Sequence, residues 1–89
     1  MSRKRKQLEK LLDGKADNNF PFDDLLAVLG HKGWTERGGG GSHRIFFNPL
    51  HPAAMVNVQP GANGKAKSYQ IRQIRELFRK TENENEQGK

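Results

Sequence analysis

The 89-residue sequence contains no cysteine, which excludes a disulfide framework and a thiolate metal site. It lacks any apolar run approaching the ~18 residues that a membrane-spanning helix needs. No hydrophobic segment follows the basic start Met1–Lys6, as a secretion signal would require. Hydrophobic residues make up only 33% of the chain, so its core must be small. We therefore expect one small cytoplasmic domain with no membrane partner.

The charge of the chain is strongly one-sided. The chain has sixteen Lys and Arg residues and ten Asp and Glu residues, which gives a formal net charge of +6. Such a balance attracts polyanions, with nucleic acid the leading candidate and an acidic protein the next.

Hydrophobic periodicity predicts three helices. The first covers residues 3–13, where leucines recur at helical spacing. The second should begin at Asp23 as N-cap, with Phe22 as a staple residue, and end near Gly33. The third is capped by Ser68 and carries an apolar stripe with arginines beside it.

Between the second and third helices the pattern becomes extended. Three strands are predicted, at Trp34–Arg37, Arg44–Phe47 and Met55–Gln59. The glycine tract Gly38–Gly41 forms the first turn, although its composition is also that of a flexible linker. The order α-α-β-β-β-α predicts an α+β domain with helices on one face of a three-stranded antiparallel sheet.

The C-terminal residues differ in composition from the rest. From Thr81 onward the chain is rich in Glu and Asn and lacks apolar side chains. We expect a single domain over residues 1–80 and a disordered tail over 81–89.

The strongest chemical candidate is His43, in the run Gly41-Ser42-His43-Arg44. A turn made by Gly41 and Ser42 can expose a histidine at the start of a strand. Neutral imidazole accepts a proton near pH 7, and RNA carries its own nucleophile in the 2′-hydroxyl. One base and nearby cations therefore suffice to cleave RNA, although a surface histidine at a hairpin end has the same sequence pattern.

Cations that can contact phosphate occur in three places. Arg44 follows His43, and Lys65 and Lys67 occupy a glycine-containing loop that leads into the last helix. Arg72 and Arg75 belong to an arginine stripe on that helix. We predict that these five residues bind RNA; a solvated loop and a solvated helix face are the alternatives.

The other two histidines suggest no catalytic site. His31 lies near a helix C-terminus, where a partly charged imidazole interacts favourably with the helix dipole. His51 is a loop residue next to Pro52. Their spacings match no zinc pattern, so we expect no metal and no cofactor.

Taken together, these motifs resemble the HicA family of bacterial toxin–antitoxin toxins. The resemblance covers roughly Leu8 to Arg79. The residues that carry it are Phe22-Asp23-Asp24-Leu25, Gly33-Trp34, Gly41-Ser42-His43-Arg44-Ile45-Phe46, Asn57-Val58-Gln59-Pro60 and Lys65-Ala66-Lys67-Ser68-Tyr69-Gln70-Ile71-Arg72-Gln73-Ile74-Arg75.

This resemblance implies a fold like that of double-stranded-RNA-binding domains. It also implies a metal-independent endoribonuclease, an mRNA interferase, with His43 as its single catalytic histidine and a HicB-type antitoxin as its partner. Two alternatives stay open: a non-catalytic RNA-binding module of the same fold, and a basic domain that binds an acidic protein.

Overall fold

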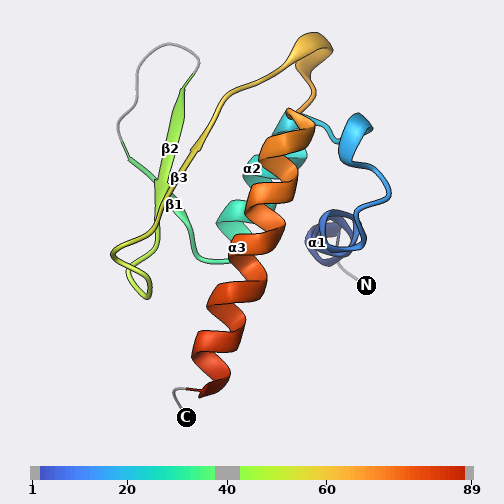
Figure 1. Ribbon diagram of the computed structural model, residues 1–89. Coiled ribbons are helices and arrows are strands. Elements are labelled where there is room, and N and C mark those ends of the chain that lie inside the picture. Colours follow the sequence, from blue (N-terminus) through green and yellow to red (C-terminus); the bar gives the residue numbers. More distant parts are fainter. Residues whose placement is uncertain (1–2, 38–42, 88–89) are drawn as a thin grey trace.

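The computed structural model describes residues 3–37 and 43–87 of the chain (Figure 1). The elements are α1 (Arg3–Asp13), η1 (Asp17–Asn19), α2 (Phe22–His31), β1 (Thr35–Glu36), β2 (Arg44–Phe47), β3 (Met55–Val58), η2 (Ala62–Gly64) and α3 (Ser68–Gln87). The strands form an antiparallel sheet in the order β1-β2-β3, and the helices lie on one side of it. The expected α+β class and element order are confirmed.

The sheet buries the face that its alternation predicts. Val56 and Val58 of β3 are buried, whereas Met55 and Asn57 between them are exposed. Phe46 lies opposite Val56 and is also buried, so these side chains form the inner face. Successive strand residues point to opposite faces, so Asn57 belongs to the outer, solvent-facing side.

The core fills the space between this inner face and the helices. On α3, the central helix in Figure 1, Ile71, Ile74 and Phe78 form the buried stripe. The remaining buried apolar side chains are Leu11, Phe20, Phe22, Leu25, Val28, Leu29, Trp34, Phe46, Val56, Val58 and Ala66. Because α3 contacts both the sheet layer and the other helices, it holds the two halves of the domain together.

The second helix begins two residues earlier than expected. Pro21 is its N-cap, and the Pro21 carbonyl accepts a hydrogen bond from the Leu25 N–H at 3.2 Å. Asp23, which we expected at the cap, lies in the first turn, where a carboxylate favours the positive helix end. The expected C-terminal turn is confirmed, because Gly33 has φ +90° and the Trp34 N–H returns to the Leu29 carbonyl at 2.9 Å.

Other predicted boundaries also shift. Ser68 is the first residue of α3, not its cap, and the Lys67 carbonyl accepts hydrogen bonds from the first-turn amides. The helix does not end near Lys80: residues 81–87, expected as a disordered tail, continue it to Gln87. Thr81 is buried, and its hydroxyl donates to the Phe78 carbonyl at 3.1 Å, so this buried polar group has a partner.

The N-terminal segment is attached to α3 through a clasp made by Arg75 and Asp17. Arg75 Nη1 and Nη2 donate to the two Asp17 carboxylate oxygens at 2.9 Å each, and Nη1 also donates to the Leu11 carbonyl at 3.0 Å. The two side chains are only 14% and 13% exposed. Gly14 makes room for the guanidinium, because a Cβ there would lie 3.2 Å from Arg75 Nη1.

We predict that Arg75→Ala destabilises the fold by about 3 kcal/mol, because it leaves the Asp17 carboxylate largely buried without its partner. Urea unfolding measures the change. Arg79→Ala is the matched control: Arg79 is exposed, and its ion pair among the described side chains is with an exposed Glu76 at 3.9 Å, so its loss should stay within about 0.5 kcal/mol. Equal losses in the two variants would contradict the clasp.

The clasp also predicts a pH dependence. The hydrogen bond from Arg75 holds the pKa of Asp17 below its ordinary value. A lowered folded-state pKa stabilises the protein above the ordinary carboxyl range near 3.9, and that contribution disappears as pH falls through the folded-state pKa. The difference in unfolding free energy between wild type and Asp17→Asn should be constant from pH 7 to 5 and shrink below about pH 4. A difference that persists undiminished at pH 3 would refute this.

Candidate active site

His43 lies at the mouth of the hairpin formed by β2 and β3. It immediately precedes β2 and is exposed, and its Nδ1 lies 3.4 Å from Asn57 Oδ1 on β3. The partners Gly41 and Ser42, which we predicted to position it, lie outside the described residues. The structure therefore supplies a contact for the imidazole that the sequence motif did not indicate, an amide from the neighbouring strand.

A shallow groove of about 240 Å³ adjoins this histidine, between the end of β3 and the first turns of α3. Its lining residues are His43, Asn57, Gln59, Tyr69, Gln70 and Gln73. Four of these six side chains are amides, and none carries a formal charge apart from a protonated imidazole. The groove is therefore a polar but nearly neutral surface.

The start of α3 is joined to the end of β3 through Gln70. The Gln59 N–H, which follows the last residue of β3, donates to Gln70 Oε1 at 3.3 Å. Gln70 is only 6% exposed, yet no buried side-chain nitrogen or oxygen of the described residues lacks a partner. Its NH₂ group therefore reaches solvent and remains a donor.

The sequence analysis missed this cluster of amides. Asn57 and Gln59 alternate along one strand, and Gln70 and Gln73 are three residues apart on a helix, so each pair shares a face. That spacing was a usable signal. The meeting of the two pairs was not visible, because it depends on how α3 packs beside β3.

The arginines predicted to bind RNA lie away from His43. Arg44 pairs with Glu36: its Nη2 donates to Glu36 Oε1 at 2.7 Å and its Nε to Oε2, and this hydrogen bonding lowers the pKa of Glu36. As the strand neighbour of His43, Arg44 points to the opposite face of the sheet. Arg75 is committed to Asp17.

Helix geometry explains the separation on α3. Each residue advances by about 100°, so Arg72 and Arg75 lie on a different side from Gln70 and Gln73. Arg75 faces η1 through Asp17, and Arg72 is exposed on that side, close enough to help lower the Asp17 pKa. The glutamines instead border β3.

The two predicted lysines do not line the groove. The Gly61 N–H donates to the Lys65 carbonyl at 2.7 Å, and Lys65 pairs with Pro21 in an isolated bridge. This pairing gives the loop a fixed backbone. Lys67 is half-buried and precedes Tyr69 by two residues. Neither lysine has an acidic partner among the described residues, so both remain available to a phosphate.

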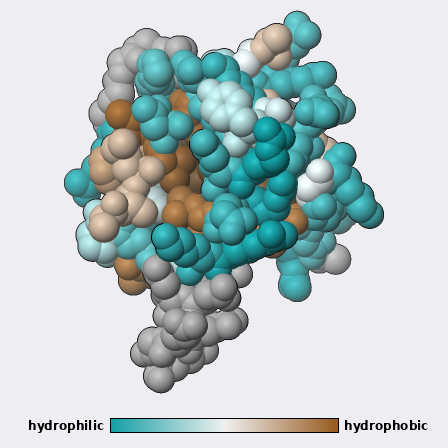
Figure 2. All heavy atoms as spheres, viewed as in Figure 1, coloured by the Kyte–Doolittle hydropathy of each residue, from teal (hydrophilic) through white to brown (hydrophobic). Residues whose placement is uncertain are grey.

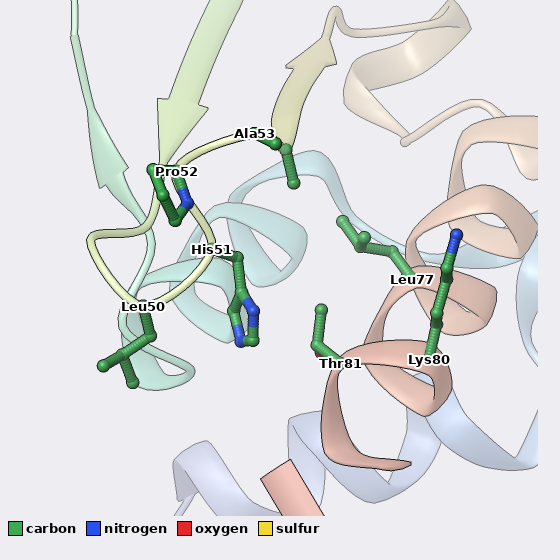
Figure 3. A pocket seen from close by; sticks show the side chains of 8 residues that line it. Leu50, His51, Pro52, Ala53, Leu77, Lys80 and Thr81 are labelled. Carbon is green, nitrogen blue, oxygen red and sulfur yellow. The ribbon is translucent and has the colours of Figure 1, made fainter. Parts of the chain in front are cut away.

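A larger cavity than this groove lies by His51 and has a volume of about 390 Å³. Figure 3 shows the His51 ring beside the loop between β2 and β3, facing Thr81 of α3. The ring also stacks on Trp34, with centroids 6.5 Å apart, so the expected loop position of His51 is confirmed. Aliphatic side chains make up most of the lining of the cavity by His51. The lining of the His43 groove consists mainly of side chains that form hydrogen bonds. The smaller groove is therefore the better site for RNA chemistry.

The visible surface agrees with this contrast. Hydrophilic side chains dominate the face in Figure 2, and hydrophobic ones emerge mainly where the sheet approaches α3. Within residues 3–37 and 43–87, no three His, Asp or Glu residues gather as a metal-binding group. In the same part of the chain, none of the helices has the length and apolar character to cross a bilayer.

These observations define a small basic α+β domain that exposes one histidine beside a groove of uncharged polar side chains. Residues 22–81, about two thirds of the chain, match the sequence model of the HicA toxin of bacterial toxin–antitoxin systems. The chain therefore belongs to the HicA toxin family. The match begins at the first residue of α2, so α1, η1 and the Asp17 side of the clasp lie outside it.

No curated protein and no solved structure matches the chain significantly. The likeness to double-stranded-RNA-binding domains that we inferred from the sequence therefore remains a prediction beyond the confirmed α+β arrangement.

Proposed function

We propose that this toxin is an mRNA interferase, a metal-independent endoribonuclease that acts in the cytoplasm with His43 as its catalytic residue and is neutralised by a HicB-type antitoxin. The observation that carries the proposal is the exposed His43 imidazole beside Asn57, at the edge of a polar groove, in a chain of the HicA family.

The contact with Asn57 assigns roles to the two ring nitrogens. If Nδ1 carries the proton, it donates to Asn57 Oδ1, and Nε2 is left as the acceptor. Nε2 removes the proton of an RNA 2′-hydroxyl, and that oxygen attacks the adjacent phosphorus. The bond from phosphorus to the 5′-oxygen breaks, the imidazolium returns its proton to that oxygen, and a 2′,3′-cyclic phosphate remains.

Phosphate contacts come from the two lysines that precede α3. Lys65 and Lys67 lie on the segment that leads into α3, and Arg72 adds positive charge farther along the helix. We reassign Arg75 to the clasp and Arg44 to its pair with Glu36. With one histidine as acid and base, each role contributing ~10²–10⁴-fold, the enzyme should be slow.

We predict that His43→Ala lowers the cleavage of a cellular RNA pool by at least about 100-fold in the presence of EDTA, because the general base is lost. Gel analysis of RNA integrity measures this, and circular dichroism verifies folding. His31→Ala is the matched control, since His31 is an exposed histidine at the end of α2, and it should retain activity. If wild type and His43→Ala behave alike, a non-catalytic RNA-binding module is the better description.

We predict that Lys65→Ala and Lys67→Ala each weaken RNA binding and reduce the slope of log K against log salt by about 1, as the loss of one phosphate contact should. The measurement is fluorescence anisotropy across a salt series, in a His43→Ala background that prevents cleavage. Lys15→Ala, at an exposed lysine before η1, is the control. A slope that stays unchanged would remove the 60–67 segment from the RNA footprint.

A further inference from the structure

The groove beside His43 contains more polar side chains than the proton transfer itself requires. We propose that it is a binding site for one unpaired nucleobase next to the cleaved phosphodiester, with the ring of Tyr69 as a stacking platform and the amides of Asn57, Gln70 and Gln73 as contacts to the base edge. The placement of this base next to the cleaved phosphodiester rests on the proposed function. The proposal makes single-stranded RNA the substrate class.

Tyr69 has the exposure that stacking needs. It lies in the first turn of α3, lines the groove, and is 46% exposed. Among the exposed large apolar side chains of the described residues, it is the only aromatic one; the others are Leu50 and Met55. Every base has a π-face, so an exposed ring beside the reacting group binds unpaired nucleotides of any sequence.

The amides supply hydrogen bonds of both polarities. Each carboxamide offers an acceptor oxygen and an NH₂ donor, the pair that complements the edge of a base. Gln70, which lines the groove, accepts the Gln59 N–H at its oxygen, and this leaves its NH₂ group as the donor of that side chain. Asn57 and Gln73 are exposed, so their amides can reach the edge of a base.

The charge of the groove distinguishes a base from a phosphate as its occupant. Its lining contains no lysine or arginine, although the chain has sixteen. A phosphate would gain little from such a lining, whereas a neutral base would lose little on leaving water for amide partners. Phosphates are left to Lys67, two residues before Tyr69 in the sequence.

The size of the groove fits one base. At about 240 Å³ it is smaller than the ≈ 300–1,000 Å³ pockets that hold drug-sized ligands. In an RNA duplex the faces of each base are covered by its stacked neighbours, so a base that stacks on Tyr69 must be unpaired.

The test compares the affinity of the His43→Ala protein for a labelled 12-nucleotide random RNA, single-stranded and annealed to its complement, by fluorescence anisotropy. We expect tighter binding of the single strand. Tyr69→Ala should weaken single-strand binding about 10-fold, the order of one lost base–aromatic stack, and leave duplex binding nearly unchanged. Tyr69→Phe, which keeps the ring, should bind like the parent, and Leu50→Ala is the control for loss of an exposed apolar side chain elsewhere.

A second arm tests the amides. In wild type, sequencing the 5′ ends of cleavage products gives the base preference at the cut. Gln73→Ala should flatten that preference, whereas Asn18→Ala, at an exposed amide on η1, should not.

Equal affinity for single strand and duplex, or a Tyr69→Phe defect as large as that of Tyr69→Ala, would overturn the base site even if the protein cleaves RNA. A protein that fails to cleave RNA but shows the Tyr69 dependence would overturn the proposed catalysis and support the base site. The two hypotheses therefore fail separately.

Discussion

Ile71, Ile74 and Phe78 bury one face of α3 between the sheet and the other helices, and this burial fixes the direction of every other side chain on that helix. A helix turns by about 100° per residue, so the residues on either side of the buried stripe must point to opposite neighbours. One side meets β3 and presents Gln70 and Gln73 beside His43. The other meets η1, where Arg75 binds Asp17.

The two sides of α3 serve different purposes. On the β3 side, uncharged polar groups surround an exposed imidazole, an arrangement suited to proton transfer and to contact with a base. On the η1 side, an ion pair holds an N-terminal helix that lies outside the region matched to the HicA family. The ion pair is largely buried, so it depends on both partners being present: loss of either leaves an uncompensated charge.

Sequence patterns predicted the elements of this fold well. Leucines at helical spacing gave α1 its exact limits, and β2 was predicted from Arg44 to Phe47 as observed. The errors in the predicted elements lay at their ends, where tertiary contacts help to decide the boundary. The N-cap moved to Pro21, β3 stopped at Val58 instead of Gln59, and α3 continued past Lys80 to Gln87. Element ends are less sharply specified than element interiors.

The sequence by itself determined the α+β class, the basic charge and the resemblance that directs attention to His43, because these follow from composition, local periodicity and short motifs. Only the tertiary structure decided which charged and polar residues meet. Arg75 looked like part of a phosphate-binding stripe, but its guanidinium reaches Asp17 across 58 residues of chain. Asn57 and the glutamines of α3 looked unremarkable, yet packing brings them to the catalytic candidate. Such contacts join residues that are far apart in the sequence. No local pattern encodes the direction in which a helix face is buried.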